Sequence, residues 1–298
     1  MPDPFEALRT APTPIDPDPA FAARLRARVA RALSLEGDQP MTLQTPETAE
    51  RLRQGDISYL ALWVHDVPRA AAFYAQVLGW QLAPDSGPYR EIGGQSMAHG
   101  LTELRPSADF MAAELGMPSA PVSGPTGFVV FVVDNLQAGI ERVRAAGGRA
   151  GSPKQQPYGP VAACADDQGM LFSLHEVPAD MPAPRPQTAR QGDVAYLTFE
   201  VGDSARARAF FGSVLGLQFS HGRIEDGWGI AEIAPMSGLS GGHPQTTIVP
   251  MYRVDDIGAA VQRVRALGGT ATDPSREPYG LASDCADDQG TRFNLGQF

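Results

Sequence analysis

Two stretches of this chain repeat each other, and this internal repeat constrains the fold more than any other feature of the sequence. Residues 54–60 (QGDISYL) recur as residues 191–197 (QGDVAYL), and residues 72–79 recur as 209–216, both 137 positions later. The later motifs, including the hexapeptide that begins at Cys164, recur 121 positions further on. The first repeat therefore carries about 16 extra residues, and we expect an elaborated loop at Pro106–Pro125 to hold them.

The repeat sets the expected boundaries. We expect an N-terminal extension at 1–55, a first domain at 56–177, a linker at 178–192 and a second domain at 193–298. The linker contains four prolines, which exclude a regular helix or a paired strand. In the extension, residues 20–34 form a predicted amphipathic helix, because apolar residues recur every four positions along it.

Each repeat contains the same order of hydrophobic patterns twice. In the first repeat a strand pattern at 57–64 precedes a helix pattern at 68–78 and three short strand patterns, and the order restarts at residue 128. Each repeat is thus two β-α-β-β-β units. We predict the α+β class, with two tandem domains, each an open eight-stranded, cup-like sheet with its helices outside.

Composition excludes several classes of function. The formal net charge is −10, which disfavours a nucleic-acid partner, and no apolar run reaches the ~20 residues that a membrane span needs. Lys154 is the only lysine, and no phosphate-binding Gly-rich loop with Lys occurs. The two cysteines are too few for a disulfide framework and suit a reducing cytoplasm, where we expect the protein to reside.

These motifs resemble those of the vicinal oxygen chelate superfamily, which includes glyoxalase I, bleomycin-resistance proteins and extradiol dioxygenases. The resemblance rests on Val64-His-Asp-Val and Val201-Gly-Asp-Ser, on the helix motifs that end in Val-Leu-Gly, and on the Asp-Asp-Gln-Gly hairpins at 166–169 and 287–290. The chain is also similar to tandem-domain members called hydroxylase-like or glyoxalase-like, which have a similar N-terminal extension. The resemblance covers both repeats and implies the cup-like fold.

The resemblance also implies where a metal ion would bind in metal-dependent members, and this chain departs from that pattern. Stable divalent metal binding needs three or four converging His, carboxylate or thiolate donors. At the positions where metal-dependent members have their ligands, only Glu91 or Glu232 in the middle hairpins could bind a metal ion. The other side chains at these positions are weak metal ligands or have no donor atom. We therefore expect neither a metal site nor another cofactor, because the family's positions hold Tyr59, Phe128 and Ser173 in one domain and Tyr196, Val249 and Asn294 in the other.

Strand alternation predicts which side chains look into each cup, since residues two apart point the same way. The first cup is predicted to be aromatic and apolar, as in many small-molecule pockets. Its aromatic rings either line a pocket or fill the cup as core, and His175 beside Tyr59 is either an acid/base pair or a structural hydrogen bond. The predicted ligand-binding residues here are Tyr59, Trp63, His99, Phe128, Val130, Ser173 and His175.

The second cup is predicted to be more polar. Glu200 and Arg253 stand at corresponding places on two strands, so we expect an ion pair that closes the cup or awaits a polar substrate. In an enzyme, Glu200 would be the general base and Arg253 the clamp for an oxyanion or carboxylate, with His175 and Tyr59 the candidates in the first cup. The predicted ligand-binding residues of the second cup are Tyr196, Thr198, Met251, Arg292 and Asn294.

The leading functional prediction is metal-independent sequestration or carriage of an aromatic or hydrophobic small molecule, such as an antibiotic or a pathway metabolite. Three alternatives stay open: an acid/base isomerase, cyclase or lyase, a metal-dependent glyoxalase-like or dioxygenase-like enzyme with displaced ligands, and an inactive interaction module. The expected partner is a small molecule, and the protein is expected to be a monomer with an internal pseudo-dimer, or a homodimer.

Overall fold

The computed structural model describes residues 50–84, 87–118, 127–180 and 189–298. The predicted helix at 20–34 and most of the predicted linker lie outside these residues. Within them, no helix is long and apolar enough to span a bilayer.

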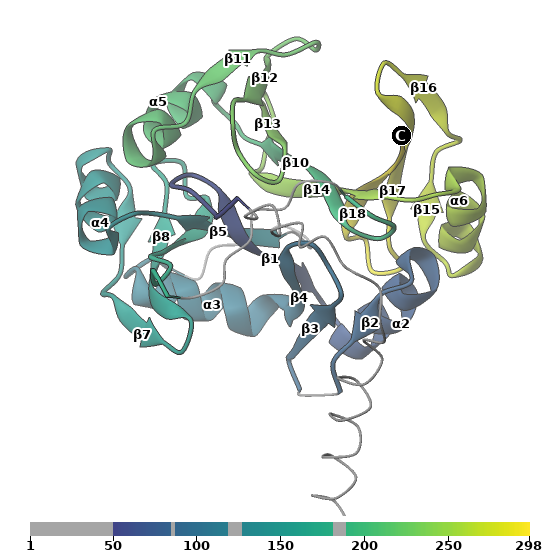
Figure 1. Cartoon of the computed structure of the whole chain (residues 1–298), viewed down its shortest axis with the longest axis horizontal. Coiled ribbons are helices and arrows are strands. Elements are labelled where there is room, and N and C mark those ends of the chain that lie inside the picture. The colour runs from purple at the N-terminus through teal and green to yellow at the C-terminus, as the bar shows by residue number, and fades with distance from the viewer. Residues whose placement is uncertain (1–49, 85–86, 119–126, 181–188) are drawn as a thin grey trace, which may run out of the picture. The chain divides into compact units, whose positions relative to one another are not determined.

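The first repeat forms one open, mixed sheet of nine strands (Figure 1). The strand order is β2-β3-β4-β1-β5-β9-β8-β6, and β7 pairs with β8. The strands are β1 (Ile57–Val64), β2 (Gln81–Leu82), β3 (Tyr89–Gly93), β4 (Ala98–Glu103), β5 (Gly127–Val132), β6 (Arg149–Ala150), β7 (Lys154–Gln156), β8 (Gly159–Ala165) and β9 (Leu171–His175). The helices are α2 (Val67–Leu78), α3 (Leu104–Glu114) and α4 (Leu136–Ala145).

The second repeat forms an equivalent sheet, in the order β11-β12-β13-β10-β14-β18-β17-β15 with β16 on β17. Its strands are β10 (Val194–Glu200), β11 (Phe219–His221), β12 (Gly227–Ile230), β13 (Ser237–Ser240), β14 (Thr247–Arg253), β15 (Thr270–Ala271), β16 (Ser275–Glu277), β17 (Gly280–Ala286) and β18 (Arg292–Gln297). Its helices are α5 (Ser204–Leu215) and α6 (Ile257–Ala266).

The α+β class and the two open sheets agree with the prediction, but two details differ. Each sheet has a ninth strand, β7 or β16, which forms a short hairpin with the strand that follows it. The predicted loop at Pro106–Pro125 is wrong in its first part, because α3 occupies residues 104–114 and includes Pro106 in its first turn. Proline is accepted there because the first N–H groups of a helix have no partner within it.

Short polar motifs start the helices. Asp66 caps α2 by accepting from the Arg69 amide (2.9 Å), and Asp203 caps α5 by accepting from the Arg206 amide (3.0 Å). A glycine in the left-handed conformation ends each of these two helices, as expected for a position where a side chain would be strained. The repeated Val-x-Asp and Val-Leu-Gly motifs therefore define helix ends.

The two repeats share one hydrophobic core and pair as a pseudo-dimer. Helix α2 packs beside α6, and α4 packs beside α5, so each helix pair joins the two repeats (Figure 1). Phe73 of α2 makes an edge contact with Phe293 of β18 (6.3 Å between ring centroids), and Phe211 of α5 contacts Phe172 of β9 (5.7 Å). Aromatic side chains on the helices of each repeat thus pack against the sheet of the other repeat.

The repeated hairpin motif fastens the repeats to each other. Gln289 exchanges two hydrogen bonds with the backbone of Asp66 (2.7 and 3.0 Å), and Arg69 pairs with Asp288. We call this set of contacts a clasp, and a second, equivalent clasp joins the other pair of segments. There Gln168 exchanges two hydrogen bonds with the Asp203 backbone (2.9 and 3.0 Å), and Arg206 pairs with Asp167 (2.8 Å). The Asp-Asp-Gln-Gly motifs are therefore part of the interface between the repeats.

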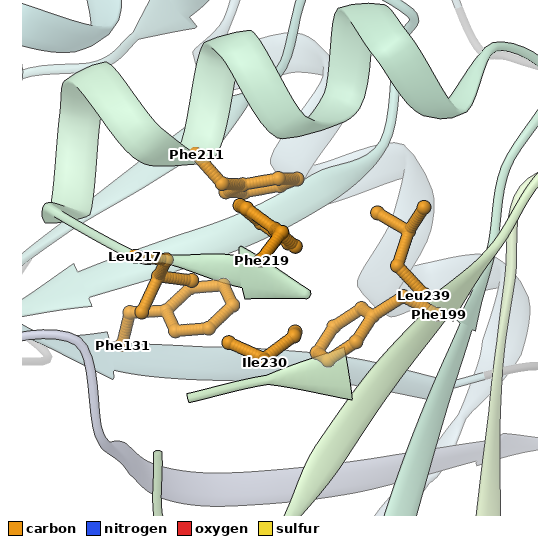
Figure 2. Close-up of a pocket in the computed structure, with 7 residues that line it drawn as sticks. All are labelled: Phe131, Phe199, Phe211, Leu217, Phe219, Ile230 and Leu239. Atoms are coloured by element: carbon orange, nitrogen blue, oxygen red, sulfur yellow. The ribbon is translucent and has the colours of Figure 1, made fainter. Parts of the chain in front are cut away.

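A small cavity of about 10 Å³ lies in the shared core beneath α5 (Figure 2). A cavity of this size holds at most one water, and a water needs polar partners, which an apolar lining does not offer. It is a packing defect of the core and too small for an organic ligand. Its seven lining residues are Phe131, Phe199, Phe211, Leu217, Phe219, Ile230 and Leu239.

Candidate functional site

The register of the central strands defines one cup face in each sheet. In the first sheet Tyr59 pairs with Val130 and Ala61 with Phe128, whereas Leu60 and its neighbours point into the core with α2. In the second sheet Tyr196 pairs with Met251, Thr198 with Val249 and Glu200 with Thr247. We call the face with Tyr59, Ala61 and Trp63 the first cup, and the face with Tyr196, Thr198 and Glu200 the second cup.

Helix α3 covers one end of the first cup. Its buried residues Leu104, Ala108 and Met111 pack against Trp63, Phe128 and Leu171, in a hydrophobic cluster separate from the main core. Trp63 is 2% exposed, and its ring centroid lies 5.6 Å from that of Phe128. Trp63 and Phe128 therefore act as filler beneath α3, which is one of the two outcomes that the sequence left open.

The other end of the first cup carries polar groups that bind each other. His175 contacts the Ser58 hydroxyl through Nδ1 (3.2 Å) and the Tyr158 carbonyl through Nε2 (2.9 Å), and burial lowers its pKa. Burial, and then its contacts with Tyr89, raise the pKa of Tyr59 well above its usual value. The structure thus gives His175 and Tyr59 separate partners, and the predicted acid/base pair is not formed. Val130 and Ser173, which were also predicted to line this cup, are register partners on the neighbouring strands β5 and β9.

His99 was predicted to face the first cup, and the structure places it on the opposite face. In the β1–β4 register His99 pairs with Leu60, which belongs to the core. Its imidazole is fully buried, stacked on Tyr252 (5.7 Å) and against the edge of Trp80 (4.9 Å), and desolvation lowers its pKa to about 3. His99 is a neutral core residue between the repeats.

Glu200 forms the predicted ion pair, but with a different arginine. Arg292 of β18 binds the carboxylate through two parallel hydrogen bonds, Nη1 to Oε2 (2.7 Å) and Nη2 to Oε1 (2.8 Å), which raise the pKa of Arg292. The predicted partner Arg253 pairs with Asp255 instead (3.3 Å). The reason is the antiparallel register: Glu200 faces Thr247, six residues before Arg253 and ~20 Å away along β14.

Sequence reasoning missed two residues beside this ion pair. His243, in the connector after β13, approaches Glu200 Oε2 through Nδ1 (3.5 Å) and contacts the Ser240 hydroxyl through Nε2 (3.0 Å). Ser240 is the register partner of Glu200 in β13, so both lie on the same row of the second cup. The pairing of β10 with β13 brings Glu200 and Ser240 together across 40 positions of the sequence. The one sequence signal for this site is the short connector Gly241–Thr246, which stands where the first repeat has the longer segment with α3.

The rest of the second cup combines polar and apolar groups. Thr198 is half-buried, Met251 lies on the floor, and the Asn294 amide donates to Asp284 Oδ1 (3.1 Å). Burial raises the pKa of Tyr196, and Arg223 opposes this shift. The rim carries the exposed apolar side chains Ile224, Tyr279 and Phe298, with Arg223 stacked 5.3 Å from the Tyr279 ring centroid.

The two cups differ at corresponding positions. Where the first repeat has apolar groups beneath α3, the second has the ion-paired cluster, and no helix of the described residues packs over it. Figure 1 shows the second sheet curving from β11 through β14 to β16. The corresponding residues are Trp63 and Glu200, Phe128 and Val249, and Leu171 and Arg292. The second cup is therefore the candidate functional site.

Neither cup has the donor set of a divalent metal site. The structure places Tyr59, Phe128 and Ser173 on the face of the first cup, and Tyr196, Val249 and Asn294 on that of the second. Glu91 is exposed on β3, and Glu232 lies in the turn after β12. Within the described ranges, no three His, Cys, Asp or Glu side chains converge on one point, so these residues do not fit a bound ion.

Comparison with known proteins agrees with the topology. The model of the Glyoxalase/Bleomycin resistance protein/Dioxygenase superfamily matches residues 56–174. The first repeat belongs to this superfamily. Because the second repeat shares its motifs and its strand order, the chain is a tandem-domain member of the superfamily. No curated protein matches the sequence.

Solved structures with the superfamily fold resemble most of the chain at low sequence identity. The Mn(II)-bound glyoxalase from Novosphingobium aromaticivorans has 16% identity and a TM-score of 0.60, with 82% of each chain covered. An extradiol ring-cleaving dioxygenase from B. fuscum has 13% identity and a TM-score of 0.58, covering 84% of this chain and 73% of its own. The 2,2',3-trihydroxybiphenyl 1,2-dioxygenase from Sphingomonas wittichii has 16% identity and a TM-score of 0.54, covering 84% and 91%. These likenesses concern the fold of the superfamily.

Proposed function

We propose that this superfamily member binds an aromatic or hydrophobic small molecule with a polar group, without a metal ion, in the second cup. The observation that carries the proposal is the contrast between the cups: α3 packs onto the first, and the second keeps a polar cluster at the same positions. The proposed ligand is an antibiotic or a pathway metabolite, and the two buried free cysteines accord with a reducing cytoplasm.

The lining of the second cup supports an amphipathic ligand. A pocket for an organic molecule is mostly apolar with a few converging polar groups, and here Met251 and Tyr196 provide the floor while Tyr279 and Ile224 stand at the rim. The guanidinium of Arg292, whose side chain is 55% exposed, is the group that would meet a polar or anionic substituent. A buried carboxylate such as Glu200 is costly unless paired, and its pairing keeps Arg292 in place.

The test uses native mass spectrometry of the full-length protein purified from its own cells. We expect a retained organic compound. Met251→Trp should fill the second cup and abolish retention, whereas Val130→Trp, the corresponding change in the first cup, should leave retention unchanged. Thermal melting of both variants checks that they are folded.

Two results would overturn this proposal. Retention that survives Met251→Trp and is lost in Val130→Trp would move the site to the first cup. Near-stoichiometric metal in elemental analysis of the same sample would favour the metal-dependent alternative, with ligands other than those of the family pattern.

The second candidate is an acid/base enzyme, which the contact between His243 and Glu200 favours. The imidazole lies within reach of the carboxylate and on the cup side of the sheet, where a bound compound would meet it. In that case His243→Gln removes turnover of the retained compound and keeps its binding. The hydroxylase-like name of similar tandem proteins stays a prediction.

A further inference from the structure

Four polar side chains of the second cup form one continuous chain of contacts. Ser240 Oγ lies 3.0 Å from His243 Nε2, His243 Nδ1 lies 3.5 Å from Glu200 Oε2, and Arg292 Nη1 lies 2.7 Å from the same oxygen. The order is hydroxyl, imidazole, carboxylate. This is the arrangement in which a base activates a serine and a carboxylate orients the base.

One tautomer of His243 satisfies both of its contacts. Glu200 accepts hydrogen bonds only, so the tautomer that suits this contact carries its proton on Nδ1, 3.5 Å from Oε2. Nε2 is then the free lone pair, and it accepts the Ser240 hydroxyl proton. The carboxylate is held by Arg292 through two hydrogen bonds, so the imidazole is oriented by a fixed group.

Ser240 is 8% exposed, so only a small part of its surface is accessible from the cup. The residues on its side of the cup are glycines: Gly227 pairs with Ser240, and Gly229 pairs with Gly238, the register partner of Thr198. A Cβ at Gly238 would overlap the Tyr196 hydroxyl, so this position of β13 must stay a glycine. In the first repeat α3 and the apolar ring of Trp63 occupy the corresponding end.

We propose that Ser240 is a nucleophile activated by His243, and that the second cup hydrolyses esters of aromatic or hydrophobic compounds. The proposal rests on the second cup being the binding site, and it adds a reaction to it. Glu200 is the positioning residue of His243. Arg292 is the cation of the cluster, and its remaining N–H groups would stabilise the developing oxyanion.

The reaction balances with water as the only co-reactant. Ser240 Oγ forms a bond to the ester carbonyl carbon, and its proton moves to His243 Nε2. The bond between that carbon and the alkoxy oxygen then breaks, and the alcohol leaves with the proton from Nε2. A water attacks the acyl-serine with His243 again as base, which releases the acid and restores the Ser240 hydroxyl.

The experiment labels the full-length protein with a fluorophosphonate and locates the adduct by intact-mass and peptide mass spectrometry. We expect one adduct, on Ser240, that is absent in Ser240→Ala and forms at least ~100-fold more slowly in His243→Gln. Burial raises the pKa of Cys164 to about 12 and of Cys285 to about 11, so neither thiol competes at neutral pH. The matched controls are Ser213→Ala in α5 and His221→Gln in β11, which should label at the wild-type rate.

Hydrolysis of p-nitrophenyl butyrate gives the second measurement, with the same ranking of variants expected. No adduct on folded protein, an adduct on another residue, or labelling that His243→Gln does not slow would overturn the proposal. Native mass spectrometry separates this failure from that of the binding proposal: a compound retained by both wild type and Ser240→Ala, without labelling, leaves a binding protein and removes the esterase.

Discussion

At the scale of single residues, the buried hairpin aspartates of the two repeats differ in their hydrogen bonds. Asp287 accepts from the Gln289 and Thr291 amides through Oδ1 and from the Tyr74 hydroxyl through Oδ2 (3.2 Å). Asp166 makes the equivalent backbone bonds, but its buried Oδ2 has no hydrogen-bond partner among the described residues. Tyr74 corresponds to Phe211, which has no hydroxyl to donate.

Phe211→Tyr should therefore stabilise the protein in a pH-dependent way. Burial raises the pKa of Asp166 to about 6, above the ~3.9 of an unfolded chain. Between these values the folded state keeps a proton that the unfolded chain releases, so the free energy of unfolding falls as the pH rises through this window. A new hydroxyl donor favours the carboxylate, and we expect a gain of about 1 kcal/mol at pH 7.5 and less at pH 4.5, measured by urea denaturation.

Tyr74→Phe is the matched reverse change. It removes the donor from Asp287, whose pKa burial already raises, and should cost about 1–2 kcal/mol at pH 7.5 and less at pH 4.5. Equal effects at both pH values, in either variant, would mean that the hydroxyl acts through packing and not through the carboxylate.

At the scale of elements, α3 is what distinguishes the first cup from the second. Met111 is 6% exposed and packs in the cluster with Trp63 and Leu171, whereas Phe110, the adjacent residue, is 60% exposed. Met111→Glu would bury a charge against these apolar groups, so we expect α3 to detach from the cup and the protein to lose about 2–4 kcal/mol of stability.

Limited proteolysis checks this prediction, with cleavage expected between residues 104 and 118. Phe110→Glu is the control on the exposed side of the same helix, and it should change stability by less than ~0.5 kcal/mol. If Met111→Glu leaves the helix protected, then α3 is held by its flanking strand and by the Lys154–Glu114 ion pair and not by the cup.

The periodicity of the sequence was sufficient for the central elements and insufficient for α3. The strands and helices of each β-α-β-β-β unit have clear apolar alternation and capping residues such as Asp66, which are local signals. The segment of α3 is rich in proline, serine and alanine, and its helix is stabilised by packing on Trp63, a long-range contact that local patterns do not contain.

The candidate site shows the same limit. Alternation placed Tyr196, Thr198, Glu200 and Arg292 on one face, because it needs only the period of a strand. The partner of Glu200 depends on strand register and on which strands are neighbours, so Arg253 was wrong and His243 was missed. The prediction for His99 was wrong for a related reason. In a short strand between glycines, hydrophobic alternation does not show which residues face the cup, and the β1–β4 register places His99 on the core face.

At the scale of the whole molecule, the repeated motifs serve the pairing of the repeats. Asp66 and Asp203 cap helices and bind the glutamine of the other repeat's hairpin, while Arg142 bonds the Val214 carbonyl at the end of α5 (2.7 Å). The ion pair of the candidate site, by contrast, occurs in one repeat only, because Trp63 and Leu171 stand where the second repeat has Glu200 and Arg292. The sequence motifs that the two repeats share therefore lie at the interface between them, whereas the positions that differ lie in the cups, where we propose that the ligand binds.

This division predicts that neither repeat folds alone. Phe73 and Tyr74 of the first repeat bury Phe293 and Tyr252 of the second, so a separated half would expose aromatic rings that belong to one common core. A protease site inserted between residues 180 and 189 allows the chain to be cut after folding. We expect the two fragments to stay together in size-exclusion chromatography, to unfold in one transition by circular dichroism, and to show a midpoint that rises with protein concentration.

The fragment 189–298 expressed alone should lack a cooperative transition. If it unfolds cooperatively by itself, or if the cut protein shows two independent transitions, the repeats are autonomous domains and the clasps only orient them.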